Sequence, residues 1–220
     1  MPSTTVENYV KQLYLEQQRR HGEVVPMGVL AELMHVAPGT ATSMAKTLAQ
    51  SGLIHYEPRT GARLTEGGTQ LSLHILRRHR IVELFLVTQL GLHWSEVHDE
   101  AEELEHVISD RILERMDELL GFPGVDPHGD PIPTPQSGLD VERRSSLLEC
   151  ELARPLRVAR ILDQNAVFLT FVERHGLVPG AGVTVKMRDA QADAVVLSVV
   201  KGDRVTLGAA AARNILVEPR

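Results

Sequence analysis

Hydrophobic positions in the first 50 residues repeat at helical spacing in three separate segments. Thr4, with Glu7 three residues later, matches a capping box and predicts a helix beginning there. Pro26 fits the first turn of a short second helix. After a break near Gly39, a third helix is predicted from about Thr40 to Gln50, with hydroxyl and lysine side chains on its polar face.

Two short stretches that favour strands follow the third helix. Leu53–Glu57 and Ala62–Thr65 flank a turn at Pro58–Gly61 and predict a hairpin with a basic tip. Two helices, a tight turn, a polar-faced helix and such a hairpin are typical of a winged helix-turn-helix, a DNA-binding unit. The alternative is a small helical domain with a hairpin and no DNA-binding role.

The middle of the chain is predicted to be helical and to end in a connector. A long helix is expected from about Glu66 to Leu90. Ser95 is a candidate cap for a next helix that runs to about Asp110 and continues or restarts through Leu120. From Gly121 to Gly138 the composition shifts to proline and glycine, which indicates a semi-rigid connector.

The last third of the chain has short apolar or alternating stretches separated by turn residues, a pattern that favours strands. A small β-barrel of five or six strands is predicted from 156–162, 167–172, 183–188, 194–199 and 204–207. The whole chain is therefore predicted to be mostly α with a small β part. The expected domains are a winged helix-turn-helix (1–70), a helical domain with its Pro-rich linker (71–138), and a small β-barrel domain (139–220).

Composition and charge refine this picture. The 220 residues are 43% hydrophobic, which argues against a disordered protein, and the single cysteine, Cys150, excludes an intrachain disulfide framework. Without a long apolar stretch or a leader pattern, the chain is expected to be soluble and cytoplasmic. The net charge of −6 resides mainly in residues 91–150, which hold 15 acidic and 4 basic side chains. Net charge therefore does not exclude DNA binding, and the acidic segment is suited to collecting cations.

The acidic segment carries a pattern of potential metal ligands. If one helix covers it, His98, Glu102, Glu105 and His106 project from a single face. His79 and Glu83 repeat the i,i+4 spacing on the preceding helix. Imidazole and carboxylate donors suit first-row divalent ions, and a bound cation relieves the repulsion between neighbouring carboxylates. The alternative for each residue is a solvated helix face. Asp126 and His128 in the connector form a weaker candidate for a second site, because Asp and Gly are also ordinary turn residues.

These motifs together resemble the DtxR/MntR family of metal-dependent transcriptional repressors, the diphtheria toxin repressor among them. The resemblance covers essentially the whole chain. It is carried by Arg78-His79-Arg80 with Glu83, by the segment from Val97 to Asp110, by the linker Asp126–Pro133, and by Gly176–Gly180 with Val183, which is similar to a FeoA-type barrel. The resemblance implies that 71–138 is a metal-binding and dimerisation domain and that 139–220 is an SH3-like barrel. It also implies a homodimer, and not an enzyme, that binds a palindromic operator and represses metal-uptake genes with Mn²⁺ or Fe²⁺ as corepressor.

By residue, the resemblance implies a primary metal site of Glu102, Glu105 and His106, completed by a ligand from the first helix. An adjacent site would use His79, Glu83 and His98, and Asp126 and His128 can take part. Asp163 and Glu173 are the candidates for an oxygen donor from the barrel.

Two positions depart from the family pattern. The first-helix ligand is Asp in manganese-type and Met in iron-type members, and it falls at Asn8 here. A second acidic residue of some manganese-type members falls at Lys11. Position 102 is Glu, as in manganese-type members, rather than the Cys of iron-type members, so Mn²⁺ is slightly favoured over Fe²⁺.

The same hypothesis assigns the DNA contacts. Thr40, Thr42 and Ser43 would approach bases or phosphates, Lys46 would hold a phosphate, and Arg59 and Arg63 of the wing would contact the DNA backbone. Two rival interpretations assign the protein to other functional classes. A metalloenzyme could use the same ligands but shows no nucleophile or substrate-pocket motif. A winged-helix interaction protein without a metal response would bind its operator regardless of a chelator.

Overall fold

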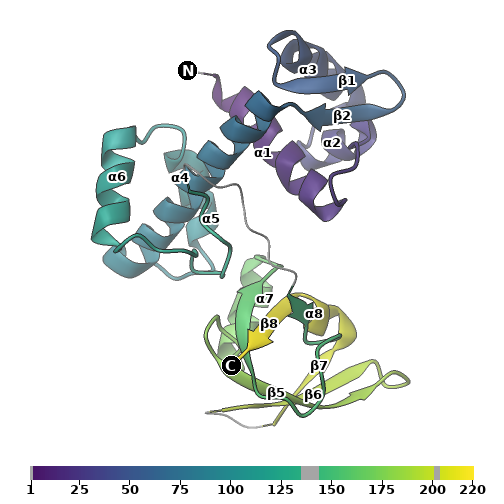
Figure 1. Ribbon diagram of the computed structural model, residues 1–220, viewed down its shortest axis with the longest axis vertical. Helices are drawn as coiled ribbons and strands as arrows, with labels where there is room; N and C mark the ends of the chain where they lie inside the picture. The colour runs from purple at the N-terminus through teal and green to yellow at the C-terminus, as the bar shows by residue number, and fades with distance from the viewer. Residues whose placement is uncertain (1, 135–143, 201–203) are drawn as a thin grey trace. The chain divides into compact units, whose positions relative to one another are not determined.

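A computed structural model describes residues 2–134, 144–200 and 204–220 (Figure 1). It forms two compact units, divided between Arg78 and His79. The first unit is built on residues 2–78. The second is built on residues 79–132 and on the C-terminal β domain. Among the described residues, no helix is both long and apolar enough to cross a membrane.

The first unit has the expected helices and hairpin: α1 (Thr4–Arg19), α2 (Met27–Leu33), α3 (Pro38–Gln50), β1 (Ile54–Glu57) and β2 (Gly61–Leu64). The strands pair antiparallel, with Ile54 opposite Leu64. The predicted cap of α1 is wrong by one residue, since Ser3 occupies the N-cap and its Oγ accepts a hydrogen bond from Val6 N. Pro26 likewise precedes α2 as its N-cap rather than lying in its first turn.

Helix α4 (Glu66–Leu90) has the predicted length and contributes residues to both units. Its N-terminal half packs on α1, where the buried Ser72 Oγ donates to Val10 O at 2.9 Å. Its C-terminal half contributes Ile81, Val82 and Leu86 to the hydrophobic clusters of the second unit. The polar side chains of this half therefore lie among the elements of the second unit.

The segment after α4 differs from the single helix expected. Helix α5 (Val97–Leu104) ends before Glu105 and His106, and Ser109 caps a separate helix, α6 (Asp110–Leu119). The shared-face expectation therefore holds only for His98 and Glu102. The cap explains the break, because Ser109 has an extended backbone and its Oγ accepts a hydrogen bond from Ile112 N at 3.4 Å. Ile108, just before this cap, packs against the hydrophobic clusters of both helices.

The C-terminal domain is a six-stranded sheet in the order β3-β8-β4-β5-β6-β7, with two helices. Its elements are β3 (Ser145–Ser146), β4 (Leu156–Ile161), α7 (Ala166–Arg174), β5 (Gly182–Asp189), β6 (Ala194–Val199), β7 (Arg204–Gly208), α8 (Ala209–Arg213) and β8 (Ile215–Pro219). The strands predicted near β4 to β7 are confirmed, and β3, α8 and β8 are additional.

The strand predicted over 167–172 is wrong, because this segment is helix α7. Asn165 caps its first turn by accepting a hydrogen bond from Val167 N at 3.0 Å. Leu169 and Val172, three residues apart, are both buried, whereas Val167 is 80% exposed. A short apolar run fits a strand or a buried helix equally well from its pattern, and here the cap and the packing favour the helix.

Candidate metal centre

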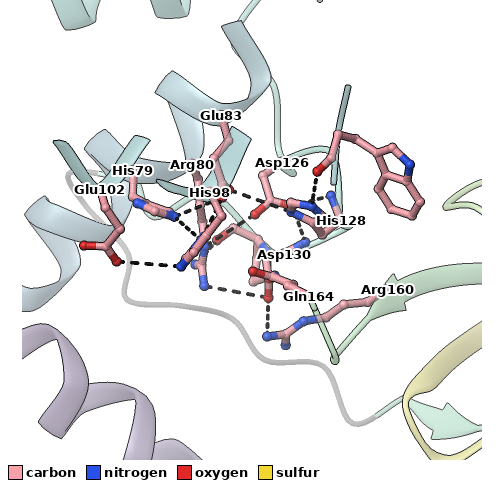
Figure 2. A network of polar contacts seen from close by, with 12 residues as sticks. His79, Arg80, Glu83, His98, Glu102, Asp126, His128, Asp130, Arg160 and Gln164 are labelled. Carbon is pink, nitrogen blue, oxygen red and sulfur yellow. Dashed lines mark hydrogen bonds and ion pairs between the residues drawn. The ribbon is translucent and has the colours of Figure 1, made fainter. Parts of the chain in front are cut away.

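His79, Glu83 and His98 meet where α4 faces α5 (Figure 2). His79 Nε2 lies 3.0 Å from Glu83 Oε1 and 3.2 Å from His98 Nδ1. Glu83 is 1% exposed, so a carboxylate and two imidazoles share a mostly buried position. These are the three residues expected to form the adjacent site, and the structure brings them together.

The other ring nitrogen of His79 faces a second group. His79 Nδ1 lies 2.6 Å from the buried Glu105 Oε2, and Glu102 completes a group whose ligand atoms are all within 4.8 Å of one another. His106 Nε2 lies 3.4 Å from the other oxygen of Glu105. Of the expected trio, Glu102 and Glu105 therefore share a group, whereas His106 contacts Glu105 without joining any of the three groups found among the described residues. His79, expected in the neighbouring site, also belongs here.

A third group joins α4 to the connector. Glu83, Asp126 and His128 bring their ligand atoms within 4.8 Å of one another, and all three residues are buried. The connector is held in a tight loop in which Asp126 Oδ1 accepts hydrogen bonds from His128 N and Asp130 N. The weaker candidate pair of the sequence thus lies beside Glu83, which is shared with the first group.

The contacts of His128 identify which ring nitrogen carries a hydrogen. Its Nε2 lies 2.9 Å from the Trp94 carbonyl oxygen, which only accepts, so Nε2 carries the hydrogen. Nδ1 is buried, has no hydrogen-bond partner among the described residues, and lies 3.8 Å from Glu83 Oε2. Whenever the ring is neutral, this nitrogen has a lone pair close to a carboxylate. A divalent cation would satisfy both groups, so the donor set fits a metal.

The buried carboxyls have perturbed pKa values. Burial raises the pKa of Glu83, but His79, His98 and His128 outweigh this effect, and the pKa lies below its usual value. Burial, with the charges of Asp130 and Glu83, raises the pKa of Asp126 well above its usual value despite the opposing Arg80. Opposite shifts on adjacent carboxyls are typical of functional clusters with excess negative charge.

Asp130 joins this cluster to the C-terminal domain (Figure 2). Its side chain contacts Arg160 of β4 and accepts a hydrogen bond from Gln164 Nε2 at 2.6 Å. Arg80 of α4 lies 3.7 Å from Asp130 and 3.8 Å from Asp126. Sequence reasoning missed Arg80, Arg160 and Gln164 as partners of the cluster, because nothing in their local spacing marks them.

The proposed donors from the barrel lie elsewhere. Glu173 Oε2 is 2.8 Å from His93 Nε2, and Asp163 Oδ1 accepts a hydrogen bond from Asn165 N. Neither residue joins the three groups found among the described residues. Asn8 belongs to the first unit, where its Oδ1 is buried and lacks a hydrogen-bond partner within the described chain. An unpaired amide oxygen of this kind is available as a ligand.

The candidate DNA-binding residues are accessible. Thr40, Ser43 and Lys46 are exposed on α3, and Thr42 is half-buried with its hydroxyl donating to Pro38 O at 2.8 Å. Arg59 and Arg63 are exposed on the hairpin. The two elements thus offer hydroxyl, ammonium and guanidinium groups, which can contact phosphates and base edges.

The fold and these sites define a winged-helix protein with a separate domain for metal ions. Known sequence families match in the same order: the iron dependent repressor N-terminal DNA binding domain over 1–62, the iron dependent repressor metal binding and dimerisation domain over 65–134, and the FeoA domain over 145–219.

Individual relatives are consistent with these family matches. The iron-dependent repressor IdeR of Mycobacterium tuberculosis is 31% identical over 83% of this chain and 84% of its own length. The diphtheria toxin repressor of Corynebacterium efficiens is 31% identical over 82% of this chain and 80% of its own length. A solved manganese-dependent transcriptional repressor in complex with manganese has a TM-score of 0.87 at 34% identity, covering 98% of this chain and all of that one. ScaR with bound Cd²⁺ has a TM-score of 0.81 at 33% identity over the full length of both chains.

The chain belongs to the iron-dependent repressor family. It is a metal-responsive DNA-binding repressor with a helical metal-binding and dimerisation domain and a C-terminal FeoA domain.

Proposed function

We propose that Mn²⁺ or Fe²⁺ is the corepressor of this protein and that it binds on the side chains gathered around His79 and Glu83. The observation that carries this proposal is the buried, hydrogen-bond-free Nδ1 of His128 facing Glu83. The proposed ligands are His79, Glu83, His98, Glu102, Glu105, His106, Asp126 and His128, with Asn8 as the first-helix ligand.

Manganese is the preferred ion in this proposal. The three groups found among the described residues contain only carboxylate oxygens and imidazole nitrogens. The single cysteine of the chain, Cys150, lies in the core of the FeoA domain and offers no thiolate to them. Hard oxygen donors bind Mn²⁺ more favourably than they bind softer metal ions. Iron is the alternative, favoured by the likeness to the iron-dependent repressor IdeR.

Metal would act by ordering the DNA-binding unit. An ion held by Asn8 of α1 together with the expected trio (Glu102, Glu105 and His106) would fix that unit relative to the dimer core. Two recognition helices could then enter successive major grooves, roughly 34 Å apart, on a palindromic operator. The metal ion shifts the equilibrium toward this ordered arrangement only as far as it binds that arrangement more tightly. The operator would control genes for metal uptake.

The dimer proposed here uses the outer face of α6 and the chain on either side of it. Ile112 and Leu119 lie seven residues apart on one face and are 52% and 54% exposed. Val107 and Phe122, near the two ends of the helix, are 76% and 71% exposed. Because exposed groups of large apolar side chains mark interaction surfaces and most oligomers are homo-oligomers, a second copy of this chain is the expected occupant.

Anaerobic titration of operator binding with Mn²⁺, Fe²⁺, Co²⁺ and Zn²⁺ tests the function and the selectivity together. The proposal expects binding to rise with Mn²⁺ or Fe²⁺ and to fall on chelation. Glu102→Ala and His106→Ala are expected to abolish the stimulation while the protein remains a folded dimer. Operator binding that ignores metal and chelator would instead favour a winged-helix interaction protein, the second candidate.

A further inference from the structure

The FeoA domain holds the loop that carries Asp126 and His128. Asp130, at the end of this loop, is 4% exposed and is bound on its two oxygens by Arg160 of β4 and by Gln164, which precedes α7. Asp130 N in turn donates to Asp126 Oδ1 at 2.9 Å. The FeoA domain therefore reaches the carboxylate of Asp126 through one intermediate residue.

Backbone contacts fix the same loop from the same side. Ile161 N of β4 donates to His128 O at 2.9 Å. Gly129 has φ +86°, and a Cβ there would overlap the carbonyl oxygen of Ala159. The loop and β4 thus approach each other more closely than a side chain would permit, and the backbone of His128 is bonded directly to β4.

We propose that Arg160 and Gln164 are positioning residues for the metal group of Glu83, Asp126 and His128, so that metal binding there and docking of the FeoA domain stabilise each other. This inference rests on the proposed function, which makes the group a metal site. Residues that orient metal ligands contribute strongly to affinity without touching the ion. Coupling between two binding events is reciprocal, so a metal ion at the loop must also tighten the contact with β4.

The chain contains a natural reporter for this group. Trp94 is its single tryptophan, and its ring stacks on His128 with centroids 5.5 Å apart. Its carbonyl accepts the hydrogen bond from His128 Nε2, and its side chain packs in the core of the FeoA domain. A Mn²⁺ ion on His128 is therefore expected to change Trp94 fluorescence.

The test compares Arg160→Gln with Arg157→Gln in the full-length protein. Arg157 is a matched control on the same strand, because it pairs with Glu218 of β8 rather than with the loop. Manganese is titrated anaerobically while Trp94 fluorescence is followed. Exchange of the Ile161 amide hydrogen is measured with and without Mn²⁺. Gln164→Ala and Arg160→Lys are included in case Arg160→Gln folds poorly.

The proposal expects Arg160→Gln to bind Mn²⁺ about tenfold more weakly at the reporting site. Arg157→Gln should match the wild type, and Arg160→Lys should recover part of the loss. Manganese should slow Ile161 exchange in the wild type and less so in Arg160→Gln. Equal affinities for Arg160→Gln, Gln164→Ala and Arg157→Gln would overturn the coupling. If instead Asp126→Asn and His128→Gln leave the wild-type titration unchanged, the metal site itself is wrong, which is a failure of the proposed function.

Discussion

His79 Nδ1 lies 2.6 Å from Glu105 Oε2, although 26 residues separate the two in the chain. Since Nε2 of the same ring faces Glu83, one imidazole belongs to two ligand groups. We expect His79→Ala to weaken Mn²⁺ binding by at least about tenfold and to remove metal-stimulated operator binding, because both groups lose a ligand or its orienting partner. Calorimetric titration with Mn²⁺ measures the affinity. His74→Ala on the exposed face of α4 serves as the control, and equal affinities for the two variants would contradict the assignment.

Gly129→Ala tests the close approach of the connector to β4. The substitution places a Cβ against Ala159 O and on a backbone with φ +86°, so we expect a destabilisation of about 1–3 kcal/mol. Gly124→Ala, in the same connector, has open space around the new Cβ and should change the free energy of unfolding little. Chemical denaturation of both variants decides the question, and similar stabilities would show that the approach is not tight.

Leu169→Ala and Val167→Ala distinguish a helix from a strand at α7. On a strand the two side chains would share a face, but in the structure Leu169 is buried and Val167 is 80% exposed. We expect a loss of about 2–5 kcal/mol of unfolding free energy for Leu169→Ala and nearly none for Val167→Ala. Equal losses in thermal or chemical unfolding would support the strand instead.

Lys46→Ala tests the recognition helix. Lys46 is exposed on α3 and is proposed to neutralise one phosphate. Each such contact contributes about one unit to the slope of log affinity against log salt, so the variant should bind every operator more weakly and with a slope smaller by about one. Operator binding at several salt concentrations measures this slope. If instead the substitution changes the preference for the base at only one operator position, Lys46 contacts a base rather than a phosphate.

The Cys150 thiol predicts a pH dependence of stability. Burial raises its pKa above the usual value, and Arg188, 3.2 Å from Sγ, opposes the shift only in part. The folded thiol therefore stays protonated at a pH where the unfolded thiol ionises. Its contribution to stability is complete below the usual thiol pKa and is lost as the pH rises through the folded pKa.

Urea unfolding at pH 7 to 10 should accordingly show a decline at the alkaline end that is smaller in Cys150→Ala than in the wild type. Because Cys150 is the single cysteine, alkylation by iodoacetamide offers a second measurement, and it should be slow until the FeoA domain unfolds. An identical alkaline decline in both proteins would assign the effect to other groups.

Local patterns in the sequence determined much of this protein. Periodicity located α1 to α4 and the hairpin, and i,i+4 spacing paired His79 with Glu83 on α4. Such inferences succeed because neighbours within one helix or strand are fixed by the geometry of that element alone. The family motifs then identified a metal-responsive repressor.

Tertiary structure decided how the ligands are grouped. Glu105 lies beyond the end of α5, and its Oε2 contacts His79 Nδ1 of α4. Asp130 gains Arg160 and Gln164 as partners only because β4 docks on the connector. Contacts of this kind join residues far apart in the chain, and they depend on which apolar faces pack together. No local spacing records that choice, so the folded structure was needed to reveal it.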